Sequence, residues 1–253
     1  ISINLVKEGK AAGVFSAGNT GAAVGASFLK WRMLQGLARP CIATQVPAID
    51  GNFLLLDAGA TVDCSPLNLT QFALMGNIYA RLVMKKENPK IGLLSNGTEE
   101  GKGNKLTQDA FKMISQISGI NFIGNIEGHD LFTSAVDVVV CDGFVGNVLL
   151  KSTEQLIKAV KTIIKDNVKG NLVAMLGGMM MKGAMQSFKK RSDPAEVGGA
   201  PLLGVNGYCV IGHGNSTDYA VRNGIRAVGD LVETKVNDNI VDLVHEFALD
   251  FML

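Results

Sequence analysis

Residues 136–152 read VDVVVCDGFVGNVLLKS, in which a continuous apolar run leads through a glycine-containing turn into a helical pattern. An apolar run without alternation is typical of a parallel strand whose two faces are covered by helices. Because this order recurs along the chain, we predict an α/β protein with a doubly wound, mainly parallel sheet. The expected strands are residues 12–16, 52–57, 90–95, 121–123, 136–141 and 208–212. The expected helices are residues 17–34, 66–84, 105–117, 147–165, 217–228 and 238–251.

The composition agrees with this fold class and excludes some partners. Of the 253 residues, 47% are hydrophobic and only 6% are aromatic, so the core must consist mainly of aliphatic side chains. The sequence contains no internal repeat or low-complexity linker, and we expect residues 1–253 to form a single α/β domain. A formal net charge of +1 provides no overall field that would select nucleic acid.

Cysteine and histidine usage indicates the compartment. The four cysteines and three histidines are scattered and include no CxxC pair, so we expect no zinc or other metal site. Unpaired thiols with apolar neighbours indicate a reducing cytosol. Neither a signal-peptide pattern nor an apolar run of roughly 18 residues is present. We expect a soluble, cytoplasmic protein.

Five segments that follow expected strands are rich in glycine and small polar residues. Glycine lets backbone N–H groups approach a ligand, and the N-terminus of a following helix favours an anion. Glycine and asparagine are also ordinary turn residues, which explains any one loop equally well. Together the five predict a phosphate-binding crevice at one sheet edge. The segments are SAGNTGA (16–22), DAGA (57–60), SNGTEEGKGN (95–104), CDGFVGN (141–147) and GHGNS (212–216). The candidate phosphate ligands are Ser16, Asn19, Thr20, Asn96, Gly97, Gly103, Asn104, Asn147, Lys151, Asn215 and Ser216.

Three residues in these loops are the candidate catalytic residues. Lys102 lies in a glycine-rich loop where its ammonium suits a phosphate, and a solvated loop lysine is the equal alternative. His213 lies between glycines after a buried strand and suits proton transfer or oxyanion stabilisation. Asp142 and Asp57 each end a strand before a glycine; we interpret Asp142 as functional and Asp57 as structural.

Familiar nucleotide and nucleophile motifs are absent from the sequence. The early glycines do not have the GxGxxG spacing, and residues 97–102 are one residue short of a P-loop. No GxSxG or Ser-His-Asp arrangement is evident. We therefore expect no cofactor, and a reaction in which the substrate itself, such as phosphate, is the attacking group.

Residues 172–190, LVAMLGGMMMKGAMQSFKK, contain five of the ten methionines and end beside a basic cluster. Glycines interrupt the segment, so it is expected to form two short helices or a helical hairpin. An adaptable apolar surface edged by lysine suits an acyl chain, an anionic membrane or an acidic carrier protein. A core or dimer-interface hairpin is the alternative. The candidate membrane or acyl-chain contacts are Leu172, Met175, Leu176, Met179, Met180, Lys189 and Lys190.

In their sequence and order, segments across the chain resemble the phosphate acyltransferases of bacterial phospholipid synthesis. The matching segments are SAGNTGA, DAGA, LLSNGTEEGKGN, FIGNIEGHD, VVCDGFVGNVLLKS, GGAPLLGVNG and IGHGNS. The resemblance implies transfer of an acyl group from acyl carrier protein to inorganic phosphate by a homodimer that associates peripherally with membrane. It also implies a fold akin to the isocitrate/isopropylmalate dehydrogenases and phosphotransacetylases, with residues 172–190 as a protruding helical hairpin. Family members begin with a further acidic, glycine-rich strand–turn segment, which does not appear in this sequence.

Three other functions remain open at this point. One is a phosphotransacetylase that uses coenzyme A and short acyl chains. Another is a non-catalytic, membrane-bound docking module for acyl carrier protein. A metal-dependent dehydrogenase is suggested by analogy of fold alone.

Overall fold

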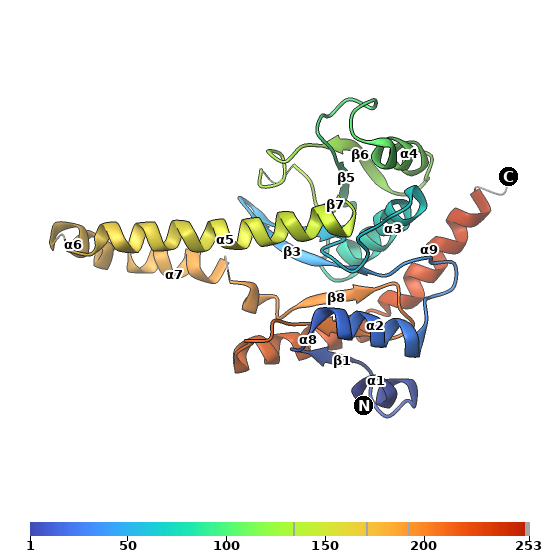
Figure 1. Ribbon diagram of the computed structural model, residues 1–253, viewed down its shortest axis with the longest axis horizontal. Helices are drawn as coiled ribbons and strands as arrows, with labels where there is room; N and C mark the ends of the chain where they lie inside the picture. Colours follow the sequence, from blue (N-terminus) through green and yellow to red (C-terminus); the bar gives the residue numbers. More distant parts are fainter. Residues whose placement is uncertain (134, 171, 192, 251–253) are drawn as a thin grey trace.

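The computed structural model describes residues 1–133, 135–170, 172–191 and 193–250, and within these ranges the strands form two sheets. Figure 1 shows the sheets one above the other, with a long helical arm projecting from between them. The four-stranded sheet has the order β1 (Val14–Ser16), β9 (Cys209–Ile211), β8 (Ala200–Leu203) and β2 (Cys41–Ile42). The five-stranded sheet has the order β3 (Thr44–Ala48), β4 (Gly51–Leu56), β7 (Val138–Val140), β5 (Lys90–Leu94) and β6 (Asn121–Ile126).

The fold class is confirmed as α/β with largely parallel sheets, but the strands are divided where we expected one sheet. In the five-stranded sheet only the β3–β4 pairing is antiparallel, and β4, β7, β5 and β6 run parallel. In the four-stranded sheet β1 and β9 are parallel, whereas β8 pairs antiparallel with both neighbours. The chain passes from one sheet to the other at Ala43, between β2 and β3.

Helices cover both sheets, and those outside the arm other than α1, which was not expected, have bounds close to those expected from the sequence. Asn19 and Asn104 cap their helices by accepting hydrogen bonds from the third following backbone N–H, as favoured N-cap residues do. The helices outside the arm are α1 (Ser2–Lys7), α2 (Thr20–Trp31), α3 (Pro66–Leu82), α4 (Lys105–Ile114), α8 (Asp218–Glu233) and α9 (Val236–Asp250), with a short 3₁₀ turn, η1 (Pro194–Glu196).

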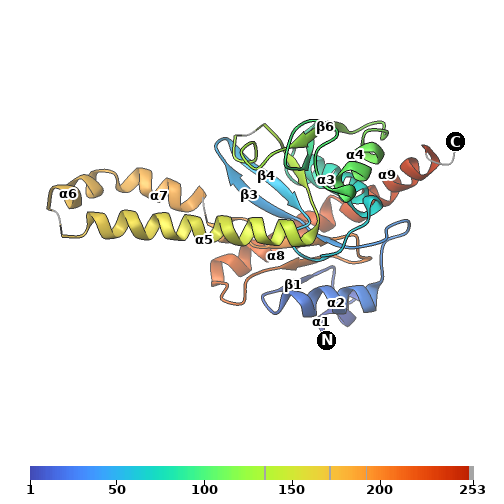
Figure 2. The ribbon, with the colours of Figure 1, turned by 45° about the horizontal axis from the view of Figure 1, so that its top comes forward.

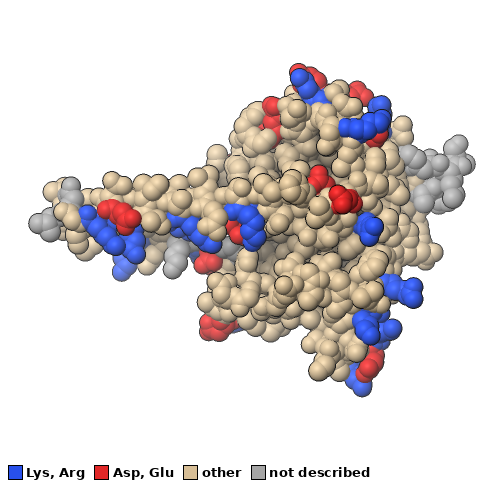
Figure 3. Space-filling model, viewed as in Figure 1, with Lys and Arg blue, Asp and Glu red and all other residues tan. Residues whose placement is uncertain are grey.

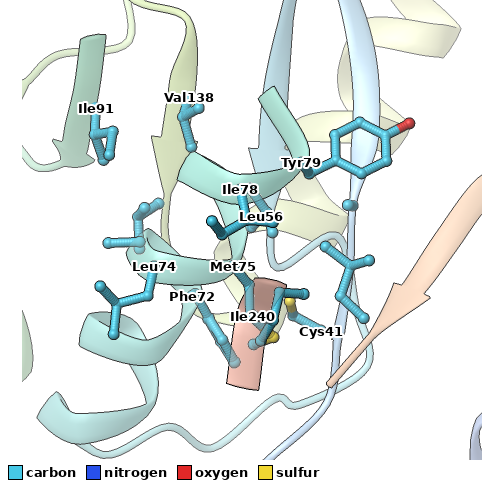
Figure 4. Packing of buried hydrophobic residues seen from close by; sticks show 14 of the residues in the cluster. Cys41, Leu56, Phe72, Leu74, Met75, Ile78, Tyr79, Ile91, Val138 and Ile240 are labelled. Carbon is cyan, nitrogen blue, oxygen red and sulfur yellow. The ribbon is translucent and has the colours of Figure 1, made fainter. Parts of the chain in front are cut away.

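Helix α3 is the centre of the larger core. It begins with a capping box formed by Ser65 and Asn68, and every residue from 68 to 80 is buried. Figure 4 shows apolar side chains of α3 among those of the five-stranded sheet and of α9. A Cβ atom at Gly76 would lie 2.6 Å from Val138 Cγ1, so the glycine permits α3 to approach β7 closely.

The projecting arm consists of α5 (Gly143–Val168), α6 (Leu172–Met180) and α7 (Lys182–Arg191). The 26 residues of α5 extend about 39 Å at the usual helical rise. The methionine-rich segment forms two short helices, which return along α5 (Figure 2), and Lys161 Nζ lies 5.5 Å from the centre of the Phe188 ring. Among the helices described, none combines the length and apolarity needed to cross a bilayer.

Candidate functional site

The parallel pairings bring the glycine-rich loops to the carboxyl ends of the two sheets. We call residues 57–61, 95–104 and 141–147 the major loop group, because they follow β4, β5 and β7 of the five-stranded sheet. We call residues 16–20 and 212–217 the minor loop group, because they follow β1 and β9 of the four-stranded sheet. Ligands of open α/β sheets bind outside such strand ends.

Asp57 is buried and organises the major loop group through hydrogen bonds to backbone N–H groups. Its Oδ1 accepts hydrogen bonds from the backbone N–H of Ile42, Gly59 and Ala60 at 2.8–3.0 Å, and its Oδ2 accepts one from Thr61 at 2.6 Å. Burial raises the pKa of the Asp57 carboxyl, and the four hydrogen bonds oppose that rise. Because Ile42 belongs to β2, Asp57 also links the two sheets, in agreement with the structural role expected for it.

Asp142 caps the long helix α5. Its side chain accepts a hydrogen bond from Val145 N at 2.8 Å, and the residue is half-buried. Two glycines that follow it pack tightly: a Cβ at Gly143 would lie 2.6 Å from Asp57 Oδ2, and one at Gly146 would overlap the Asp57 carbonyl oxygen. The observed contact of Asp142 is structural, so its expected catalytic role stays a prediction.

The loop containing Lys102 is shaped by side-chain amides. Asn96 Oδ1 accepts a hydrogen bond from Gly103 N at 2.8 Å, and Gly103 has a positive φ of 92° that favours glycine. Lys102 is exposed, and a Cβ at the buried Gly97 would lie 2.6 Å from Lys102 Cγ, so the lysine stem covers that glycine. Asn125 was not among the predicted residues. Its Nδ2 donates a hydrogen bond to Glu99 O at 2.9 Å and thereby connects the loop to β6.

The minor loop group is closed by hydrogen bonds around His213. Gly212 N donates to Ser16 O at 2.9 Å, which joins the two strand ends. Ser216 Oγ donates to His213 O at 2.6 Å. Thr20 begins α2, and both Thr20 and Asn215 are exposed. Polar groups of this loop group therefore reach solvent beside two helix N-termini.

A side chain of the arm helix reaches the minor loop group. Glu154 on α5 places Oε2 3.2 Å from Lys151 Nζ and Oε1 3.7 Å from His213 Nε2. The structure thus joins two of the predicted residues through a third that sequence reasoning missed. The spacing of Lys151 and Glu154 was visible as an i,i+3 pair, whereas the approach of His213 depends on the fold.

The other predicted residues are spread along the loops. Asn147 lies beside Gly59, where a Cβ would be 3.3 Å from Asn147 Cβ. In the part of the chain that the structure describes, no hydrogen bond or ion pair connects Lys102 with Lys151 or His213. The contacts therefore assemble Lys151 and His213 and leave Lys102 in a separate loop.

The predicted membrane contacts lie on the return limb of the arm. Met175, Leu176, Met179 and Met180 have exposed fractions of 45%, 60%, 63% and 90%, and Lys190 is exposed. The side chains of Leu172 and Lys189 lie outside the described part of the structure. Figure 3 shows Lys and Arg side chains spaced along the arm. Within one chain, the exposed methionines are not core residues.

The cysteines are unpaired and mostly buried. Among the described residues, no group of three His, Cys, Asp or Glu side chains is placed to hold a metal ion. The four cysteines are unpaired, and burial raises the pKa of Cys64 to about 12 and of Cys209 to about 11. Because the thiolate is the nucleophilic form, these thiols are poor nucleophiles near neutral pH.

Comparison with known proteins gives matches over nearly the whole chain. The family model described as "Fatty acid synthesis protein" matches residues 1–239. A protein named phosphate acyltransferase from Acidobacterium capsulatum is 48% identical over 240 residues, which are 95% of this chain and 71% of the relative. One of the same name from Wolinella succinogenes is 47% identical over 242 residues, 95% of this chain and 72% of the relative.

Solved structures with a similar fold are more distant in sequence. A phosphotransacetylase from Staphylococcus aureus has a TM-score of 0.58 at 15% identity, with 94% of this chain and 66% of that chain covered. A branched-chain phosphotransacylase from Enterococcus faecalis has a TM-score of 0.54 at 14% identity, with 91% and 77% covered. At these identities the likeness concerns the fold alone.

Proposed function

The chain belongs to the fatty acid synthesis protein family, and from this membership we infer that it is an acyltransferase that moves an acyl group from acyl carrier protein to inorganic phosphate. The products are acyl phosphate and free carrier protein, and the reaction serves phospholipid synthesis. The observation that carries this conclusion is the 48% identity, over 95% of the chain, to a protein named phosphate acyltransferase. The loops at the carboxyl ends of both sheets agree with it, because they present helix N-termini and lysines suited to phosphate.

The proposed reaction needs no nucleophile from the protein. An oxygen of hydrogen phosphate forms a bond to the thioester carbonyl carbon, and the carbon–sulfur bond breaks with its electron pair going to sulfur. The phosphate proton passes to that sulfur, which leaves as the thiol of the carrier protein. Lys151 and Lys102 supply positive charge for phosphate, and His213 is the proposed carrier of the proton.

The remaining phosphate contacts are proposed on the exposed edges of the loops. Backbone N–H groups at the starts of α2, α4, α5 and α8 supply donors beyond those used by the caps. Among the predicted ligands, Asn19 and Asn104 each use the side-chain oxygen as a cap, and the side-chain amide nitrogen of each is a proposed donor to phosphate.

The arm is proposed to contact the membrane as a peripheral attachment of a cytoplasmic enzyme. Met179 and Met180 expose apolar surface on α6, which lies at the outer end of the arm (Figure 1), and Lys and Arg side chains lie along the arm (Figure 3). Such a surface partitions into the interface of an anionic bilayer, where the acyl phosphate product would be retained. In this proposal residues 172–190 act as an insertion in a single α/β domain.

We also propose that two copies of the chain form a homodimer. Val148, Leu156 and Ile163 are exposed by 51%, 65% and 60% and recur along one face of α5. A second copy that packs against this face would remove the apolar stripe from water.

Phosphate-dependent formation of acyl phosphate from palmitoyl-[acyl carrier protein] tests the proposed reaction. Trapping the product with hydroxylamine should give palmitoyl hydroxamate in an amount that scales with phosphate, and samples without phosphate or without protein are the controls. Binding of the carrier protein without any product would support a docking module instead. Faster turnover with acetyl-coenzyme A than with the carrier-bound long chain would support a phosphotransacetylase.

A further inference from the structure

Glu154 lies where the arm helix passes the minor loop group, between two groups that carry or can acquire positive charge. Its side chain is only 17% exposed, whereas the side chains of Lys151 and His213 are each 54% exposed. The carboxylate is therefore covered by its surroundings, and the side chains of both partners reach solvent. Such an arrangement holds two exposed groups in place from beneath.

The two distances assign different interactions to the two oxygens. Lys151 Nζ donates a hydrogen bond to Glu154 Oε2 at 3.2 Å, and this permanent charge stabilises the largely buried carboxylate. The separation of 3.7 Å between Glu154 Oε1 and His213 Nε2 is too long for a hydrogen bond. Attraction across that gap is electrostatic, so it becomes strong only when the imidazole carries a proton.

We propose that Glu154 is a positioning residue for acyl transfer, which orients His213 and stabilises the positive charge of its ring while the ring carries a proton. This inference rests on the proposed function. Hydrogen phosphate gives its proton to His213 as its oxygen bonds to the thioester carbon, and His213 gives that proton to the departing sulfur. Glu154 itself neither gains nor loses a proton, and Lys151 remains directed to phosphate.

Two other pairs show what is distinctive about this one. Asp166, in the last turn of α5, and the C-cap residue Lys169 have the same i,i+3 spacing, but their side chains are 63% and 66% exposed, and their N–O separation is 3.9 Å. His129 faces Glu127 and Asp130, which belong to its own turn, and its side chain is 73% exposed. Such exposed ion pairs are expected to contribute little interaction energy, because solvent and salt screen their charges. Glu154, in contrast, joins α5 to the end of β9.

A double-mutant cycle on steady-state kinetics tests the inference. We expect Glu154→Gln to lower kcat about tenfold while KM for phosphate changes less than about twofold, because a charge needed after substrate binding is lost. In a His213→Asn background, Glu154→Gln should lower kcat by no more than about twofold further, since the two residues act together. Glu154→Asp, which keeps the charge, should retain more of kcat than Glu154→Gln. The matched control is Asp166→Asn, for which unchanged kinetics are expected.

The outcomes separate this inference from the proposed reaction. Lack of acyl phosphate with the wild-type chain overturns the proposed function and this inference with it. An active wild type, combined with independent effects of Glu154→Gln and His213→Asn, overturns only the role of Glu154. The role of Glu154 is also overturned if Glu154→Gln lowers kcat and at the same time lowers the melting temperature clearly more than Asp166→Asn does, because that result indicates a structural role.

Discussion

Helix α3 in the body and helix α6 in the arm are both rich in apolar residues, but α3 is buried and α6 is exposed. We call the two sheets and the helices outside the arm the body of the molecule. Every residue of α3 from 68 to 80 is buried among strands and helices (Figure 4). In α6, Met179 and Met180 are 63% and 90% exposed. The difference shows that apolar composition predicts an element that seeks burial, without saying whether the chain itself provides the cover.

The same contrast extends to the role of glycine. Where the first turn of α5 meets the two sheets, glycine permits a close contact between backbones, as at Gly146 beside Asp57. In the arm, a Cβ built at Gly177 meets nothing within 4 Å. We therefore expect substitutions of such closely packed glycines to destabilise the protein, and substitutions of glycines in α6 to be tolerated. This difference suits a rigid site combined with an adaptable contact surface.

The largest effect that would test this contrast is expected at Asp57. Asp57→Ala removes the acceptor for four backbone N–H groups and the link to β2, and we expect it to lower the free energy of unfolding by at least about 3 kcal/mol. Asp142→Ala removes a single cap bond and should cost about 1 kcal/mol. Urea unfolding of both variants gives the comparison.

Asp57→Asn keeps one acceptor oxygen and provides a measurement if the alanine variant does not fold. Its stability should lie between those of the wild type and Asp57→Ala. Equal losses for Asp57→Ala and Asp142→Ala would show that Asp57 is an ordinary turn residue and not the link between the sheets.

An intermediate effect is expected from the same substitution placed in two helices. Gly146→Ala forces a methyl group against the Asp57 carbonyl and should destabilise the protein by about 2 kcal/mol. Gly177→Ala introduces a better helix former into open space and should stabilise α6 by about 0.5–1 kcal/mol. Thermal unfolding measures the first change, and amide hydrogen exchange in α6 measures the second.

A destabilising Gly177→Ala would contradict the open arm, because it would require a neighbour that a single chain does not provide. The same measurement repeated at several protein concentrations would then show whether a second copy is that neighbour.

The smallest effect is expected for membrane contact. Replacing Met179 and Met180 together with aspartate should weaken binding to anionic liposomes about tenfold, because it removes apolar surface and adds negative charge. Flotation measures the binding. The matched control is the pair Leu29→Asp and Ile225→Asp, which are 75% and 60% exposed on the body. Equal loss of binding in both double variants would indicate a general charge effect and not a contact made by the arm.

Much of the fold was predictable because strand–turn–helix order is a local property. The strands β1, β4, β5, β6, β7 and β9 and the helices that follow them lie close to the expected ranges. The strands β2, β3 and β8 were missed. Both β3 and β8 contain proline, at Pro47 and Pro201, and β2 has only two residues, so none of them has the long apolar run of a parallel strand.

The site was predictable to a lesser degree. Glycine, asparagine and serine at strand ends indicated the loops, and the histidine between two glycines indicated His213. Most of the predicted ligands lie in the expected loops, where two of them, Asn19 and Asn104, act as helix caps. Glu154 was missed because its i,i+3 partner Lys151 explains it as an ordinary helix ion pair.

The α/β class, the order of strands and helices, the glycine-rich loops and, by resemblance, the family could all be inferred from the sequence. These depend on local periodicity, on turn residues and on identity along the chain. Three features became visible in the fold alone: the strands divide into two sheets joined at Asp57, the methionines of the arm are exposed, and Glu154 lies beside His213. Each of these features depends on contacts between residues far apart in the chain. The identity of a side chain does not specify which distant residue will cover it or pair with it.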